Sequence, residues 1–282
     1  MKSIILLCMA VVQNANKVKM PNMHLDKLKI ILDNEIKIRN SACELCEEKP
    51  DPLMVASKYQ NESIALICAL FAYGNAKLIV KFLNSLNFSL LECSEDEIMS
   101  NLKNYYYRFQ KSDDVIALFI ALKRLKQVDS IENIVFDGYK KDGDIIEGLK
   151  NLISSIRSVY TVHNTQGYDF LIGQVPADKI SSPYKRYMMY FRWMVRKDNL
   201  DMGLWSKIDK AHLLMPLDTH TFHLSQKLGL LNRKTYDMRA VIELTERLRR
   251  FDDKDPIKYD FAIYRLGQES QISKIIEKIN TN

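Results

Sequence analysis

The sequence predicts an all-α protein of about ten helices. Its 282 residues suffice for one large domain or two closely packed ones, since a domain averages about 150 residues. Hydrophobic residues make up 47% of the chain, so a large core can be buried, and charged residues make up 27%, as in ordinary globular proteins. With 9 Gly and 7 Pro the chain is poor in turn formers, and no segment alternates with the period of two that indicates a strand. These observations exclude a disordered chain and a small cross-linked scaffold.

Apolar residues recur at helical spacing along most of the chain. The first helix is expected over residues 23–38, ahead of a charged stretch with two prolines at 43–52. The apolar region 63–86 predicts two helices that meet at Tyr73-Gly74-Asn75, because glycine and asparagine favour a turn. Further helices are expected near residues 96–104, 113–126, 145–157, 185–196, 219–228, 238–250 and 257–266.

The N-terminus conflicts with a cytoplasmic protein. Lys2 precedes an apolar run over residues 3–12, which has the length of a signal-peptide core and is too short to span a bilayer. Residues 13–17 contain no small-residue cleavage site, and Met20 or Met23 could be the true start. We therefore treat residues 1–22 as a doubtful extension: a signal, an anchor or a mis-called start. The folded unit is expected over residues 23–282, without a membrane span.

The cysteines favour a reduced, cytoplasmic protein. There are five of them, an odd number at scattered positions, which does not fit a disulfide framework. Cys43 and Cys46 form a lone C-x-x-C motif without a second Cys or His pair to complete four zinc ligands. His220 and His223 also lack a third ligand at recognisable spacing. We expect neither a metal nor a cofactor.

Positive charge is concentrated in one segment of the chain. The whole sequence carries a formal net charge of +6. Residues 182–250 contain 14 Lys and Arg but only 7 Asp and Glu, so this segment alone carries +7. Such a distribution is typical of a nucleic-acid face, and the alternative is an ordinary solvated helix surface.

Two residues in this segment, Lys185 and Asp218, lie at predicted helix starts. A turn-rich loop over residues 176–183 leads into the helix expected to begin near Lys185, whose first-turn amides would face solvent or an anion. Asp218 stands directly before another helix, where an N-cap residue belongs. Capping alone would account for Asp218, and a phosphate contact or a solvated helix start would account for Lys185.

Several ordered motifs carry a resemblance to a known family: Tyr105-Tyr-Tyr-Arg-Phe109, Lys185-Arg186, Phe191-Arg-Trp-Met-Val-Arg196, Asp201-Met-Gly-Leu-Trp205, Pro216-Leu-Asp-Thr-His220, Leu228-Gly-Leu-Leu231 and Asp255-Pro-Ile-Lys-Tyr-Asp-Phe-Ala262. Together they resemble the bacterial domain-of-unknown-function 2400 family from about Asp51 to Gly267. That family in turn looks like a remote branch of the helix-hairpin-helix DNA glycosylase superfamily. The resemblance implies a glycosylase-like helical unit of two packed subdomains, with the active-site segment at 176–267.

The superfamily resemblance implies a DNA repair enzyme that removes a damaged base, an oxidised purine. It assigns the nucleophilic amine to Lys185 and the catalytic carboxylate to Asp218, and a Schiff base on the lysine could also lead to strand cleavage. The usual hairpin, L-P-G-V-G-x-K-T, is replaced here by Ile180-Ser-Ser-Pro-Tyr-Lys-Arg186, which lacks glycine. The spacing of 33 residues between Lys185 and Asp218 is also longer than in the commonest glycosylases.

The remaining site residues are expected to hold the flipped base or the DNA. A base pocket needs apolar faces and a few hydrogen-bonding groups, and core packing is the alternative for each aromatic residue. The candidates for the pocket, or for orienting the reacting groups, are Trp193, Trp205, His220, Tyr259, Asp260 and Tyr264. The candidates for DNA contacts are Asn75, Ser181, Ser182, Arg186, Arg192 and Arg196.

The expected partner is double-stranded DNA, bound by a monomer. The alternative function is a catalytically silent helical module that binds DNA or structured RNA through the same basic segment. Lys185 and Asp218 distinguish the two readings, because a pure binding module needs the charge of the lysine but has no use for the aspartate.

Overall fold

The computed structural model of the protein describes residues 22–161, 165–177, 182–268 and 277. This part of the chain contains thirteen α-helices and no named β-strand, which confirms the predicted all-α class. The helices are α2 (Asn22–Arg39), α3 (Leu53–Tyr59), α4 (Glu62–Leu70), α5 (Ala76–Ser85), α6 (Glu95–Asn101), α7 (Ser112–Val128), α8 (Ile131–Tyr139), α9 (Ile145–Val159), α10 (Gln166–Ile172), α11 (Lys185–Val195), α12 (Thr219–Lys227), α13 (Met238–Arg249) and α14 (Asp260–Gln268). Short 3-10 helices lie between them, among them η4 (Pro256–Tyr259).

Polar N-cap residues set the starts of many of these helices. Asn61 accepts two backbone N–H groups at the start of α4, and Asn75 does the same for α5. Ser94 and Glu97 form a reciprocal capping box at α6. The prediction missed α3, α8 and α10, which have seven to nine residues each. Helices of this length depend on packing against their neighbours more than on their own periodicity.

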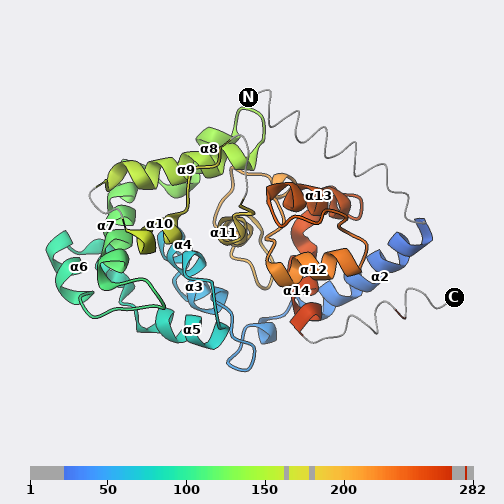
Figure 1. Cartoon of the computed structure of the whole chain (residues 1–282), viewed down its shortest axis with the longest axis horizontal. Coiled ribbons are helices and arrows are strands. Elements are labelled where there is room, and N and C mark those ends of the chain that lie inside the picture. The colour runs from blue at the N-terminus through green and yellow to red at the C-terminus, as the bar shows by residue number, and fades with distance from the viewer. Residues whose placement is uncertain (1–21, 162–164, 178–181, 269–276, 278–282) are drawn as a thin grey trace.

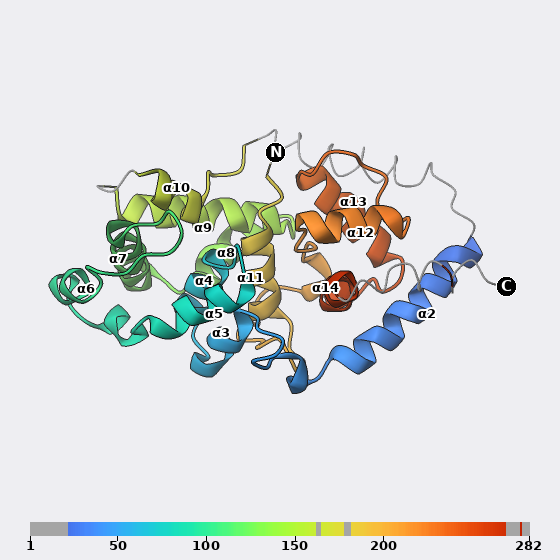
Figure 2. The same ribbon diagram turned by 60° about the horizontal axis from the view of Figure 1, so that its bottom comes forward.

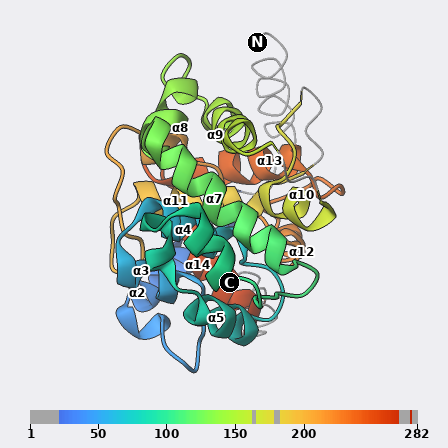
Figure 3. The same ribbon diagram turned by 90° about the vertical axis from the view of Figure 1, so that its left-hand side faces the viewer.

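Two groups of helices lie on either side of α11 (Figure 1). One group comprises α3 to α10, and Figure 3 views it from its outer side, where α7 to α10 lie together. The other comprises α2 and α12 to α14. Figure 2 shows α11 running between the groups with α14 beside it. Eight consecutive residues of α11, from Tyr187 to Met194, are buried, so this helix is enclosed on all sides.

One of the buried residues of α11 is charged, and so is the residue that follows the helix. Arg192 donates through Nε to Asp201 at 3.1 Å and through Nη1 to Asp260. Arg196 donates through Nε to Asp255 at 2.9 Å and also pairs with Asp201. All five side chains are nearly or fully buried. Four ion pairs therefore connect the C-terminal end of α11 to the loop that follows it, to the residue before η4 and to the start of α14.

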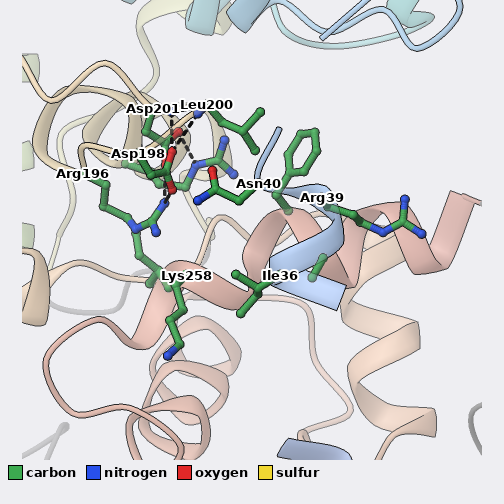
Figure 4. A pocket seen from close by; sticks show the side chains of 12 residues that line it. Ile36, Arg39, Asn40, Arg196, Asp198, Leu200, Asp201 and Lys258 are labelled. Atoms are coloured by element: carbon green, nitrogen blue, oxygen red, sulfur yellow. Dashed lines mark hydrogen bonds and ion pairs between the residues drawn. The ribbon is translucent and has the colours of Figure 1, made fainter. Parts of the chain in front are cut away.

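Arg192 and Arg196, which the sequence suggested as DNA contacts, are thus committed to internal carboxylates. Figure 4 shows the small pocket beside them, where Arg196 also approaches Asp198 at 3.0 Å. The pocket has a volume of about 20 Å³, and Ile36, Asn40 and Lys258 are among its lining residues. A volume of this size holds about one water molecule, so the pocket cannot receive a nucleobase.

We predict that Arg192→Met destabilises the protein by about 3–5 kcal/mol, because it leaves the buried Asp260 without its guanidinium. Urea denaturation followed by circular dichroism measures the change. The matched control is Lys58→Met in α3, an exposed lysine whose replacement should alter stability by less than about 0.5 kcal/mol. Equal stabilities of the two variants would show that the buried ion pairs do not hold α11 in place.

Candidate active site

Lys185 is the first residue of α11, and its side chain is partly buried. The preceding residue, Tyr184, has a left-handed conformation with a φ of 47°. Its amide donates to Ser182 Oγ at 3.3 Å, and its hydroxyl donates to the carbonyl of Gln174 at 2.7 Å, which fixes the turn into the helix. Lys185 Nζ lies 3.5 Å from Met189 Sδ, a weak acceptor. No carboxylate of a described residue lies within ion-pair distance of this amine.

Asp218 is the N-cap of α12, as the sequence predicted. Its Oδ1 accepts a hydrogen bond of 2.7 Å from the amide of Thr221. Among the described groups none donates to the other carboxylate oxygen, and the side chain is only partly buried. Capping thus occupies one of the two oxygens, and the second is left for another role.

Asp260 connects these two residues electrostatically. It begins α14, which packs directly against α12. Burial raises the pKa of Asp260 to about 6, while the Arg192 guanidinium and the Lys185 ammonium lower it and the Asp218 carboxylate raises it. The charges of Lys185 and Asp218 therefore both act on one buried carboxyl group. Two predicted residues, at the starts of α11 and α12, thus lie within electrostatic range of a third at the start of α14.

Tyr264 lies one turn beyond Asp260 on α14 and is half-buried. Burial raises its pKa to about 12, and the carboxylates of Asp51, Asp218 and Asp260 also raise it. Its hydroxyl oxygen accepts a hydrogen bond of 2.7 Å from Gln268. Sequence reasoning did not single out Asp51, whose carboxylate accepts from the amide of Leu53 at the start of α3, because nothing local to it predicts that it faces α14.

Residues 51–269 match the family model described as Protein of unknown function (DUF2400). The match covers more than three quarters of the chain. The chain belongs to the DUF2400 family. No curated protein and no solved structure matches the sequence. The DUF2400 segment contains Lys185, Asp218 and Asp260, and its limits agree closely with the limits that the sequence motifs suggested. The relationship of DUF2400 to DNA glycosylases stays a prediction.

Three of the aromatic candidates in the DUF2400 segment belong to the core. Trp193 and Tyr259 are fully buried, and Trp205 is 5% exposed. The indole of Trp205 donates to Glu62 at 2.9 Å, and the Tyr259 hydroxyl donates to Asp33 at 3.0 Å. These side chains stabilise the fold, which was the alternative considered for each of them.

The other candidates lie on the surface or beside it. Asn75 is exposed and caps α5, and Ser182 is exposed beside the turn into α11. His220 is exposed on the first turn of α12 and forms no hydrogen bond with a described residue. Arg186 donates to the carbonyl oxygens of Leu70 and Phe170. Ser181 lies outside the described residues.

The described part of the chain offers no group of three or more His, Cys, Asp or Glu side chains placed to bind a metal ion. The same residues include no helix with both the length and the apolar character needed to cross a membrane.

We predict that the buried carboxyl of Asp260 makes stability depend on pH in an unusual direction. Because its pKa is raised, the native state binds this proton more tightly than the unfolded chain does. The stability that the proton provides is present at low pH and is lost as the pH rises from about 4 to about 6. Urea denaturation across this range should show a steeper decline for the natural protein than for Asp260→Asn, which cannot titrate. Parallel curves would contradict the raised pKa.

Proposed function

We propose that the protein is a DNA glycosylase that removes a damaged base, an oxidised purine, from double-stranded DNA. The observation that carries the proposal is that the charges of Lys185 and Asp218, at the starts of α11 and α12, both act on Asp260 at the start of α14. An amine and carboxyl groups are the kinds of group that cleavage of a glycosidic bond uses as nucleophile, acid or base, and charge stabiliser. The proposal includes a monomeric enzyme that works in the cytoplasm.

Asp218 stabilises the transition state in this mechanism. When the bond between C1′ and the base breaks, its electron pair leaves with the base and positive charge develops on the sugar. A carboxylate aimed at this charge lowers the barrier. Asp218 has one oxygen fixed by the amide of Thr221 and another without a described donor, so the helix start orients the group while leaving an oxygen for the sugar.

Lys185 supplies the nucleophile. Its neutral amine forms a bond to C1′ as the base departs and gives up a proton, and opening of the sugar ring then yields a Schiff base. The attack requires an unprotonated amine, and an ion pair with a carboxylate would oppose its formation. Nζ contacts the thioether of Met189, and no carboxylate of a described residue forms an ion pair with this amine.

Tyr264 is the residue that we propose recognises the base. Its phenol offers a hydrogen bond to the edge of a purine, and its ring offers a surface for stacking. Asp260 is buried against Arg192, so it contributes through its charge and does not contact the base. Phosphate contacts fall to the exposed cations Lys197, Lys227, Lys234 and Arg239, which form no ion pair with a described residue. These three lysines and one arginine replace the buried Arg192 and Arg196 as the expected DNA contacts.

We predict that Asp218→Asn abolishes base excision while folding and DNA affinity stay nearly unchanged. Asparagine caps a helix about as well as aspartate but carries no charge to stabilise the sugar cation. Base release from duplexes that each contain one oxidised purine measures the activity. Asp218→Ala should lose activity as Asp218→Asn does. It should also lose about 1 kcal/mol of stability, because alanine cannot cap the helix. Full activity of the Asn variant would reduce Asp218 to a cap and favour the silent binding module.

We also predict that borohydride added during turnover traps a covalent complex between Lys185 and DNA. The reductant converts the Schiff base to a stable amine, and Lys185→Gln should lose the adduct while keeping most of its DNA affinity. Lys207→Gln is the matched control, because it removes an exposed lysine of the same basic segment that is not among the proposed phosphate contacts. If trapping persists in Lys185→Gln, another lysine is the nucleophile. Base release without any trapping would instead indicate an enzyme that uses water.

A further inference from the structure

A cluster of aromatic rings and guanidinium groups lies on the surface beside the start of α11. It consists of Tyr73, Arg108, Phe109, Phe170 and Arg186, and we call it the aromatic patch. Phe109 is 45% exposed and Phe170 is 41% exposed, although large apolar side chains in a folded protein are more often buried. The proposed chemistry at Lys185 uses none of these rings.

The rings form one contiguous group. The centroids of Phe109 and Phe170 lie 4.8 Å apart, and Tyr73 lies 4.8 Å from Phe170 and 5.9 Å from Phe109. The guanidinium of Arg108 lies 5.5 Å from the Tyr73 ring, and that of Arg186 lies 4.7 Å from the Phe170 ring. Flat apolar faces and planar cations are thus mixed within a few ångströms.

The backbone holds the patch in a fixed shape. Arg108 has a φ of 57°, a left-handed conformation that non-glycine residues rarely adopt. Tyr107 and Gln110 bond to each other across this turn, and the Tyr107 hydroxyl donates to the carbonyl of Tyr73 at 2.7 Å. Gly74, with a φ of 102°, lies so close that a Cβ atom there would clash with the Arg108 guanidinium. A strained turn that exposes a phenylalanine is a candidate for function.

The patch carries exposed positive charge. Arg108 is exposed and forms no ion pair with a described residue, and in sequence it lies three residues before Lys111, which is likewise exposed and without a described ion pair. Of the nearby carboxylates, Asp169 pairs with Arg157, and Asp114 is buried and accepts from the amide of Lys111. A ligand of the patch is therefore expected to combine flat rings with negative charge.

Arg186 connects the patch to the candidate active site. It directly follows Lys185, and its guanidinium bonds to the carbonyl oxygens of Leu70, at the end of α4, and Phe170, in α10. A ligand that stacks on Phe170 therefore lies next to the chain segment that carries the proposed nucleophile.

We propose that the aromatic patch stacks one or two unpaired nucleobases of a DNA strand beside the nucleotide that enters the active site. Aromatic platforms flanked by cations bind single strands in this way, because every base has a stacking face and every nucleotide a phosphate. This inference rests on the proposed function and narrows the substrate class to DNA with an unpaired stretch next to the lesion.

The test compares DNA affinity with base excision in the full chain. Fluorescence anisotropy gives the dissociation constants for a single-stranded oligothymidine and for a fully paired duplex. The double variant Phe109→Ala/Phe170→Ala should bind the single strand about 5- to 150-fold more weakly, the range for loss of one stacked base, and should bind the duplex nearly as before. Met99→Ala, which trims a 41% exposed side chain on α6, is the control and should change neither affinity.

A second variant reports on stacking directly. Phe109→Trp places an indole at the exposed position, while the natural Trp193 and Trp205 are buried. Its fluorescence should be quenched when single-stranded DNA binds, and the unsubstituted protein should show much less quenching. Circular dichroism confirms that each variant is folded.

Each outcome bears on one proposal or the other. Unchanged single-strand affinity in the double variant, or absence of quenching in Phe109→Trp, overturns the nucleobase assignment. Equal losses for the single strand and the duplex would show that the patch contacts DNA without preferring unpaired bases, which also overturns it. Selective loss for the single strand in a protein that excises no base supports the patch and removes the glycosylase proposal.

Discussion

The buried ion pairs of Arg192 and Arg196 are the constraint on which the candidate site depends. They join the enclosed helix α11 to the loop after it and to the start of α14, so they fix Lys185 and Asp260 relative to each other. Burying two guanidinium groups is costly unless each is well paired, and here both have carboxylate partners. Four carboxyl groups, Asp198, Asp201, Asp255 and Asp260, surround these two cations. Retention of a proton by Asp260 brings the cluster closer to neutrality.

The sequence was sufficient for the fold class and for most long helices, because helical periodicity and N-cap residues are local signals. It identified Asp218 as a cap from the residues beside it, and the structure confirms that position. It missed α3, α8 and α10, because seven to nine residues are too few to show a clear period. Short helices of this kind are specified by the neighbours they pack against, which lie elsewhere in the chain.

The charge of residues 182–250 shows why site residues were harder to predict than helices. Counting charges along the segment treats every arginine as a surface residue. Two of them are neutralised in the interior, partly by Asp255 and Asp260, which lie beyond the end of the segment. Partners 59 and 68 residues away cannot be recognised from local spacing. For the same reason the sequence named Asp260 as a candidate without indicating that Lys185 and Asp218 both act on it.

The positive charges at the two ends of α11 have different partners. Near its C-terminal end the cations are paired with carboxylates, whereas at its N-terminal end Lys185 and Arg186 have only a thioether, carbonyl oxygens and ring faces as described partners. The backbone dipole adds partial positive charge at the same end. Helix α11 therefore attracts a polyanion at its N-terminal end and not at its C-terminal end. The net charge of the protein does not say where a polyanion would bind, but the placement of the charges along α11 does.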